Sequence, residues 1–150
     1  MAAAAEVIGI DHIYLSVSAM DRSELFYDRL LQETLGFRKS TFTLDGDAHV
    51  QYYNRLFGIV LRPARGDGRP HDRYSPGLHH LCLRVPGVDD VDRVATRLAA
   101  AGLVATAPRR YEEYASDYYA TFVDDPDGLR LEITNFRAER RERMEHWEDR

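Results

Sequence analysis

The chain has 150 residues, and 44% of them are apolar, which suffices for one compact domain or for two small modules that share a core. Its formal net charge is -5 with acidic and basic residues interleaved, so no basic stripe predicts a nucleic-acid partner. The first residues carry no positive charge, and the apolar stretch after them ends at Asp11, so we expect neither a signal peptide nor a membrane partner, and hence a cytoplasmic protein.

The predicted elements begin with a strand and a helix. Apolar and polar side chains alternate over residues 9–17, which is typical of a half-buried strand. A helix is expected to begin after a cap at Ser18 or Asp21 and to run to about Leu35, where Gly36 ends it. Its buried stripe is expected to consist of Leu25, Phe26, Leu30 and Leu31.

Three short strands then complete a first module with the order βαβββ, over residues 8–63. These strands are expected at residues 37–43, 48–53 and 57–62. Residues 64–77 contain prolines, glycines and alternating charges without an apolar period, so they are interpreted as a linker.

A second module over residues 78–135 repeats the order of the first. It is expected to contain a strand at 78–85, a helix at 88–101, and strands at 103–107, 118–123 and 129–134. Residues 136–150 carry opposite charges at helical pairing distances, which predicts a C-terminal helix. The two modules together would form a single domain over residues 1–150.

The two modules also share a sequence repeat. The segment GIDHIYLSV at residues 9–17 returns as GLHHLCLRV at residues 77–85. Alternation places His12 and His80 at equivalent positions on the polar faces of the two strands. His79 is expected on the opposite face of its strand and is therefore left out of the candidate site.

A second, shorter sequence repeat relates GIVLR at residues 58–62 to GLRLE at residues 128–132. Under this alignment, Arg62 and Glu132 occupy equivalent positions that face away from the buried side chains. The repeat therefore predicts that His12, His80, Arg62 and Glu132 are the inward side chains of the two modules.

Two imidazoles and one carboxylate form a metal-ligand set. His12, His80 and Glu132 would fill about half of an octahedral sphere, an arrangement favoured by Fe(II) and tolerated by Mn, Co, Ni or Zn. Arg62 cannot ligate because its guanidinium stays protonated, and the alternative for Glu132 is a salt bridge, with Arg62 among its partners. Cys82 is the single cysteine, which excludes a thiolate cluster, and we expect it to be a small buried residue rather than a nucleophile.

Aromatic residues lie on or next to the inward strands. A tyrosine-rich wall suits a flat or phenolic substrate, although any single tyrosine could simply cover a strand. Arg62 could pair with a substrate carboxylate or phosphate, or could neutralise Glu132. The candidate substrate-binding residues are Tyr14, Arg62, Tyr114, Tyr118 and Phe122, and no catalytic residue is assigned.

Residues 8–135 resemble the vicinal oxygen chelate superfamily, which includes glyoxalase I, methylmalonyl-CoA epimerase, extradiol dioxygenases, fosfomycin-resistance enzymes and bleomycin-binding proteins. The motifs that carry this resemblance are GIDHI at 9–13, FY at 26–27 with LGF at 35–37, LHHL at 78–81 and DPDGLRLE at 125–132. The resemblance implies an α+β glyoxalase-like fold, in which two tandem βαβββ modules form a curved mixed-sheet cup around one divalent metal, commonly in a homodimer.

The resemblance also assigns the ligand positions. The family's two histidines fall on His12 and His80, its last-strand glutamate falls on Glu132, and its fourth ligand position falls on Arg62. This departure disfavours a four-ligand glyoxalase or epimerase and is closer to the three-ligand dioxygenases and fosfomycin-resistance transferases. Phe122, however, stands where both of those groups have a tyrosine.

We therefore expect a metal-dependent enzyme, an oxidoreductase of the dioxygenase type or a glyoxalase-like lyase. Its substrate would be a small molecule, aromatic or anionic, that chelates the metal through vicinal oxygens. The alternatives are a thiol or water transferase acting on an epoxide antibiotic and a metal-free protein that binds a drug or natural product.

Overall fold

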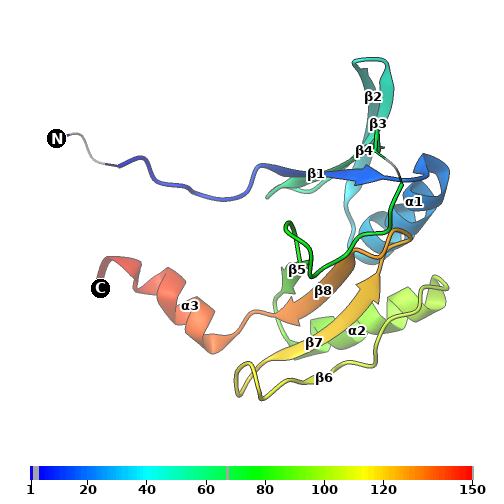
Figure 1. Ribbon diagram of the computed structural model, residues 1–150. Coiled ribbons are helices and arrows are strands. Elements are labelled where there is room, and N and C mark those ends of the chain that lie inside the picture. Colours follow the sequence, from blue (N-terminus) through cyan, green and yellow to red (C-terminus); the bar gives the residue numbers. More distant parts are fainter. Residues whose placement is uncertain (2–3, 67, 150) are drawn as a thin grey trace. The chain divides into compact units, whose positions relative to one another are not determined.

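The computed structural model describes residues 1, 4–66 and 68–149, and the chain divides into two compact units, residues 1–68 and 69–150. Each unit contains one four-stranded mixed sheet with helices (Figure 1). The expected α+β class with two βαβββ sheets is therefore confirmed.

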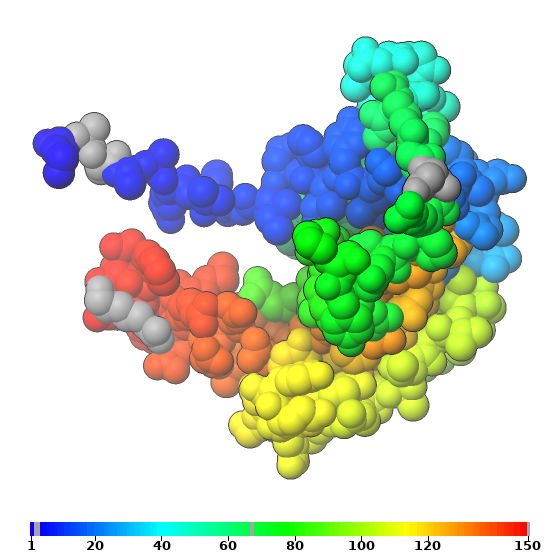
Figure 2. All heavy atoms as spheres, viewed as in Figure 1, coloured from blue at the N-terminus to red at the C-terminus, as the bar shows by residue number. Residues whose placement is uncertain are grey.

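The sheet of the first unit has the strand order β1-β4-β3-β2, in which β1 and β4 are parallel and the other pairs are antiparallel. Its elements are β1 (His12–Val17), α1 (Met20–Tyr27), the π-helical turn η1 (Asp28–Thr34), β2 (Arg38–Leu44), β3 (Asp47–Tyr53) and β4 (Gly58–Pro63). Residues 4–11 precede β1 without regular structure and extend away from the rest of this unit (Figure 2).

The helix of the first unit differs in detail from the sequence-based expectation. It changes from α to π geometry after Tyr27, and Leu35 N donates to Leu30 O across five residues at 3.1 Å. Leu25 is 54% exposed although it was expected in the core, because the buried residues around it, Ser23, Phe26, Tyr27 and Leu30, recur at intervals of three and four that exclude it. Tyr27 is fully buried in its place.

The sheet of the second unit has the equivalent order β5-β8-β7-β6, with β5 and β8 parallel. Its elements are β5 (His80–Val85), α2 (Val88–Ala100), β6 (Arg109–Arg110), β7 (Tyr119–Asp124) and β8 (Arg130–Asn135). The chain continues as α3 (Ala138–Glu145) and a single 3-10 turn, η2 (Trp147–Asp149).

The expected strand at residues 103–107 is wrong. Only an isolated bridge joins Ala105 to Val123, and the edge strand is the two-residue β6. Hydroxyl groups replace part of the regular ladder here: Thr106 N donates to Phe122 O at 2.8 Å, but Phe122 N donates to Thr106 Oγ1 at 2.9 Å and Thr121 Oγ1 donates to Thr106 O at 2.6 Å. Pro108 then lacks the backbone N–H that a continuing strand requires.

Each unit has its own apolar core on one side of its sheet. In the second unit, α2 packs on the sheet through Val91, Val94 and Leu98 against Leu131 and Ile133, which leaves the opposite, polar face of β5 and β8 for function. No helix within the described residues is long and apolar enough to cross a bilayer.

Candidate functional site

The strand registers correct the alignment of the two modules. His12 begins β1 opposite Gly58, and His80 begins β5 opposite Arg130, so the two histidines are equivalent. Glu132 lies opposite Cys82, and the corresponding residue of the first unit, opposite Tyr14, is Val60.

The expected equivalence of Arg62 and Glu132 is therefore wrong by two residues. Arg62 pairs with Ser16 and corresponds to Thr134. The two segments were aligned on Gly58 and Gly128. Gly58 is the first residue of β4, whereas Gly128 lies in the turn before β8, with a φ of 89°. This turn is built by Asp125, whose carboxylate accepts hydrogen bonds from the backbone N–H groups of Asp127 and Leu129, both at 2.9 Å.

Glu132 is the most deeply placed ionisable group on the polar face of the second unit. It is only 2% exposed, because β8 lies between β5 and β7 and both neighbours contribute side chains around it. His80 Nε2 lies 3.1 Å from Glu132 Oε2, and the Tyr118 hydroxyl donates to Glu132 Oε1. The carboxylate therefore has two partners, one of which can bind a metal.

The geometry of this pair fits a divalent metal. Two ligands at right angles, on metal bonds of about 2.1 Å, stand about 3.0 Å apart, and the His80 and Glu132 atoms are 3.1 Å apart. An imidazole nitrogen and a carboxylate oxygen are also ligand types that Fe(II), Mn(II) and Zn(II) accept.

In each candidate histidine, Nδ1 contacts the side chain of the preceding residue. His12 Nδ1 lies 2.6 Å from Asp11 Oδ2, and His80 Nδ1 lies 2.8 Å from His79 Nδ1. Such partners orient a ligating ring and leave its Nε2 available for the metal. His79 was expected on the opposite face, but it precedes β5, so strand alternation does not apply to it.

The proposed ligand set is divided between the units, with His12 in the first and His80 and Glu132 in the second. Over residues 1, 4–66 and 68–149, no group of three or more His, Cys, Asp or Glu side chains is close enough to hold a metal. The pair His80–Glu132 is thus the part of the set that the structure brings together.

Cys82 was expected to be buried, and this expectation is wrong because the residue is exposed beside Glu132. Desolvation of the thiol, with the negative charge of Glu132, raises its pKa to about 12. Desolvation and the hydrogen bond to Glu132 likewise raise the pKa of Tyr118. Raised pKa values favour the neutral thiol and the neutral phenol at physiological pH, so the absence of a nucleophilic role for Cys82 stays a prediction.

An aromatic pocket of about 400 Å³ opens beside the pair His80–Glu132. Among its lining residues are Tyr111, Tyr114, Tyr118, Phe122, His80 and Glu132. The rings of Tyr111 and Tyr114 are parallel, with centroids 5.6 Å apart, and Phe122 and Tyr118 meet Tyr111 edge-on. Three of the expected substrate-binding residues, Tyr114, Tyr118 and Phe122, thus line one cavity.

The sequence interpretation missed three further lining residues, His79, Thr106 and Arg130. The guanidinium of Arg130 lies over the Phe122 ring at 5.3 Å and pairs with Asp124. Its position on the polar face of β8, two residues before Glu132, was the available signal.

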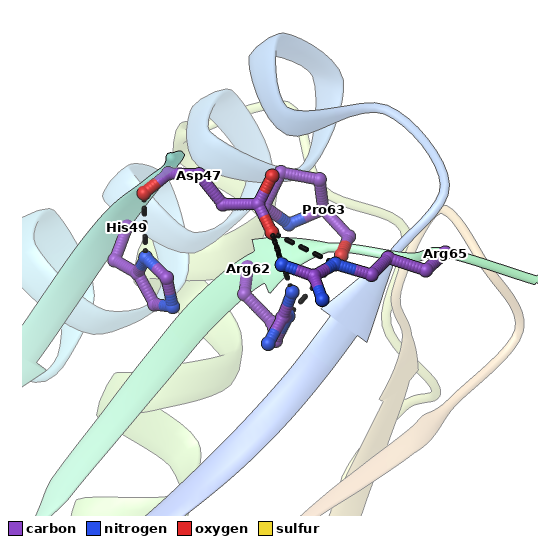
Figure 3. A network of polar contacts seen from close by, with 5 residues as sticks. All are labelled: Asp47, His49, Arg62, Pro63 and Arg65. Atoms are coloured by element: carbon purple, nitrogen blue, oxygen red, sulfur yellow. Dashed lines mark hydrogen bonds and ion pairs between the residues drawn. The ribbon is translucent and has the colours of Figure 1, made fainter. Parts of the chain in front are cut away.

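The other two expected substrate-binding residues belong to the first unit. Tyr14 is half-exposed, and its ring meets those of His12 and His49 edge-on, at 5.5 and 5.8 Å. The Arg62 guanidinium donates to Asp47 Oδ2 at 2.6 Å, and Arg65 donates to the same oxygen (Figure 3). Arg62 thus has a carboxylate partner of its own, namely Asp47.

The fold and the site define a class of protein with two βαβββ modules that each present a histidine from their first strand. The family model described as the Glyoxalase/Bleomycin resistance protein/Dioxygenase superfamily matches residues 9–133. The chain belongs to this superfamily.

Relatives cover nearly the whole chain. The uncharacterized protein YaeR of Escherichia coli (strain K12) is 31% identical over 129 residues, which are 83% of this chain and 93% of YaeR. A glyoxylase/bleomycin resistance protein/dioxygenase domain from Frankia sp. EAN1pec is 26% identical, with a TM-score of 0.72 over 88% of this chain and 100% of that domain.

A third comparison concerns a ligand complex. A variant of the fosfomycin resistance protein FosX from Listeria monocytogenes, complexed with Mn(II) and 1S,2S-dihydroxypropylphosphonic acid, is 16% identical, with a TM-score of 0.66. The match covers 91% of this chain and 98% of FosX, and it shows a common fold.

Proposed function

We propose that this protein is a divalent-metal-dependent enzyme acting on a small molecule, with His12, His80 and Glu132 holding one metal ion. The observation that carries this proposal is the 3.1 Å approach of His80 Nε2 to the buried Glu132 Oε2. Fe(II) is the favoured metal, and Mn, Ni, Co and Zn suit the same ligands.

The reaction we propose is dioxygenase-like or glyoxalase-like, on a substrate that chelates through vicinal oxygens. When bound, the metal would supply a Lewis acid, or an oxygen-activating centre if it is iron. The chain's own residues bind and orient the substrate, since the aromatic pocket accepts a flat ring beside His80 and Glu132.

Tyr118 has a positioning role in this proposal. Its hydroxyl donates to Glu132 Oε1, which fixes the carboxylate and leaves Oε2 toward His80. The raised pKa of Tyr118 keeps the phenol protonated, so it remains a donor throughout the physiological range.

A metal-free binding protein would use the same aromatic pocket, but this alternative function does not explain why the carboxylate of Glu132 is buried. Burial of a carboxylate is unfavourable unless partners or a metal compensate it, and replacement by an apolar residue is often neutral or stabilising. Val60 at the equivalent place of the first unit is such a residue. The retention of Glu132 therefore supports ligation.

Elemental analysis tests this proposal. Protein purified without chelators or a metal-scavenging tag, and then incubated anaerobically with each metal, is expected to hold about one metal ion per chain. His80→Ala and Glu132→Gln should lose it, whereas His146→Ala and Glu139→Gln, the same changes at exposed positions around α3, should retain it.

A wild-type protein that stays empty with iron, manganese, nickel, cobalt and zinc would contradict the proposal. Once the metal is known, it selects the activity screen, namely oxygen uptake for iron and isomerase, lyase or transferase assays for the others. We include a homodimer in the proposal on the basis of the family resemblance, and a cytoplasmic location on the basis of the expected lack of a signal peptide.

A further inference from the structure

A second pocket of the second unit, which we call the arginine pocket, adjoins the candidate metal ligands. It has a volume of about 370 Å³, and its lining includes Arg84, Arg137, Arg140, Cys82 and Tyr118. Tyr118 lines both pockets and hydrogen-bonds to Glu132, so the arginine pocket and the aromatic pocket meet at this tyrosine.

The arginine pocket carries more positive than negative charge. Arg137 has one carboxylate nearby, with its Nη1 3.7 Å from Glu139 Oε2. Arg84 and Arg140 have no carboxylate within ion-pair distance among the described residues, although a guanidinium offers five donors. Glu132 is directed toward His80 and Tyr118, so it does not compensate these charges.

Two of the three guanidinium groups of this pocket lie over aromatic rings. Arg84 lies over the Phe136 ring at 4.0 Å from its centre, beside Arg141 at 4.3 Å, and Arg137 lies over the Tyr118 ring at 4.9 Å. Ring contacts therefore position Arg84 and Arg137, and Arg140 lines the pocket from the exposed surface of α3.

The helix that carries Arg137 and Arg140 is anchored at its beginning. The Asp117 carboxylate accepts a hydrogen bond from Ala138 N at 2.8 Å, and Arg141 Nη2 donates to Pro86 O at 2.7 Å. Because the first turn of α3 is fixed at both sides, Arg137 and Arg140 stay beside the sheet.

We propose that the arginine pocket binds an oxyanion, namely a carboxylate, phosphate or sulfate group, through Arg84, Arg137 and Arg140. Guanidinium groups bind such anions through parallel, charge-assisted hydrogen bonds. Its role as a substrate subsite rests on the proposed function, whereas binding of the anion itself does not require the metal.

The strand geometry specifies the length of the substrate. His80, Cys82 and Arg84 lie on the same face of β5, and at about 3.3 Å per residue the first and last are about 13 Å apart along the strand. The substrate class is thus a small molecule with an anionic group about 1 nm from its chelating oxygens, and with a flat portion that fits the aromatic pocket.

The anion site is tested on the full chain after removal of metal with a chelator. The probe is inorganic phosphate, compared with chloride at equal ionic strength, and binding is measured by calorimetry and by the shift in melting temperature. Wild-type protein should be stabilised by phosphate, whereas Arg84→Gln and Arg140→Gln should bind it at least about tenfold more weakly. Benzoate and sulfate, as further probes, then rank carboxylate and sulfate against phosphate.

Arg93→Gln is the matched control, because it removes the same charge from the exposed surface of α2. Arg84→Lys keeps the charge but loses the planar fork, so it should bind more weakly than wild type and more strongly than Arg84→Gln. Equal phosphate binding in Arg84→Gln, Arg140→Gln and Arg93→Gln would overturn the proposal, as would no effect of phosphate beyond that of chloride.

The two proposals fail separately. A protein that binds phosphate in this pocket but no metal keeps the anion site and loses the proposed function. A protein that binds metal but shows no phosphate effect keeps the proposed function and loses the anion site.

Discussion

In the second unit, the side chains proposed to bind the metal lie around one carboxylate, that of Glu132. It is buried between β5 and β7, and each of its oxygens has a separate partner, Tyr118 at Oε1 and His80 at Oε2. This separation allows one oxygen to be fixed while the other is available for a metal.

Tyr118→Phe tests the positioning of Glu132. Loss of the hydroxyl should weaken metal binding by roughly tenfold, since residues that orient a ligand are typically worth 10- to 100-fold in affinity. Competition titration with a metal indicator measures the change. Tyr119→Phe is the control, because the adjacent hydroxyl contacts Asp92 on α2, and equal affinities of the two variants would contradict the role of Tyr118.

Asp47 gives a prediction on pH. The hydrogen bond from Arg65, with the nearby charge of Arg62, holds the pKa of Asp47 below its ordinary value of 3.8 in the folded chain. Its contribution to stability is therefore complete above pH 3.8 and is lost as the pH falls through the lower folded-state pKa.

The melting temperature of Asp47→Asn should accordingly lie below that of wild type at pH 7, and the difference should narrow as the pH falls below about 4. Thermal unfolding followed by circular dichroism measures both values, with the exposed Glu112→Gln as control. A difference that stays constant or widens in acid would show that the Arg62–Asp47–Arg65 cluster does not stabilise the folded chain.

At the level of single residues, the sequence predicted the equivalence of His12 and His80 because a repeated motif surrounds both. It did not predict the partner of Arg62 or the place of His79. Asp47 lies on a different strand from Arg62, and His79 lies just before the alternation of β5 begins. Such contacts depend on register and on strand ends, which a repeat in the sequence does not specify.

Among the elements, the helix of the first unit shows where the sequence prediction grouped the wrong residues. Leu25 and Leu31 were placed in one buried stripe, but six residues rotate an α-helix by about 600°, which leaves the two side chains about 120° apart. Leu31 is fully buried, whereas Leu25 is exposed.

The same substitution at these two sites tests which face of the helix is buried. Leu31→Ala should lower the free energy of unfolding by about 2–5 kcal/mol, because it leaves a cavity in the core. Leu25→Ala should change it by about 0.5 kcal/mol or less. Urea denaturation of both variants provides the comparison, and equal losses would contradict the exposed position of Leu25.

In the second unit, the sequence-based prediction was wrong at residues 103–107. The sequence predicted a strand there from its apolar residues, but hydroxyl groups of Thr106 and Thr121 take some of the ladder positions. The other predicted strands of this unit, β5, β7 and β8, and the helix α2 agree with the prediction to within two residues, because their patterns are strongly periodic.

For the whole molecule, the repeat explains both the fold and the family. Two βαβββ units with the same strand order and the same parallel first pair arise from two related halves of the sequence. The superfamily match over residues 9–133 covers both halves. We propose that each half contributes a histidine to one metal ion.

A titration with Mn(II), followed through the electron paramagnetic resonance signal of the free ion, tests that claim most directly. We predict one bound Mn(II) per wild-type chain, and an affinity lowered about 100-fold or more in both His12→Ala and His80→Ala, since each loses a ligand. If His12→Ala binds Mn(II) as tightly as wild type while His80→Ala does not, the first unit contributes no ligand, and the account of a centre shared by both halves is wrong.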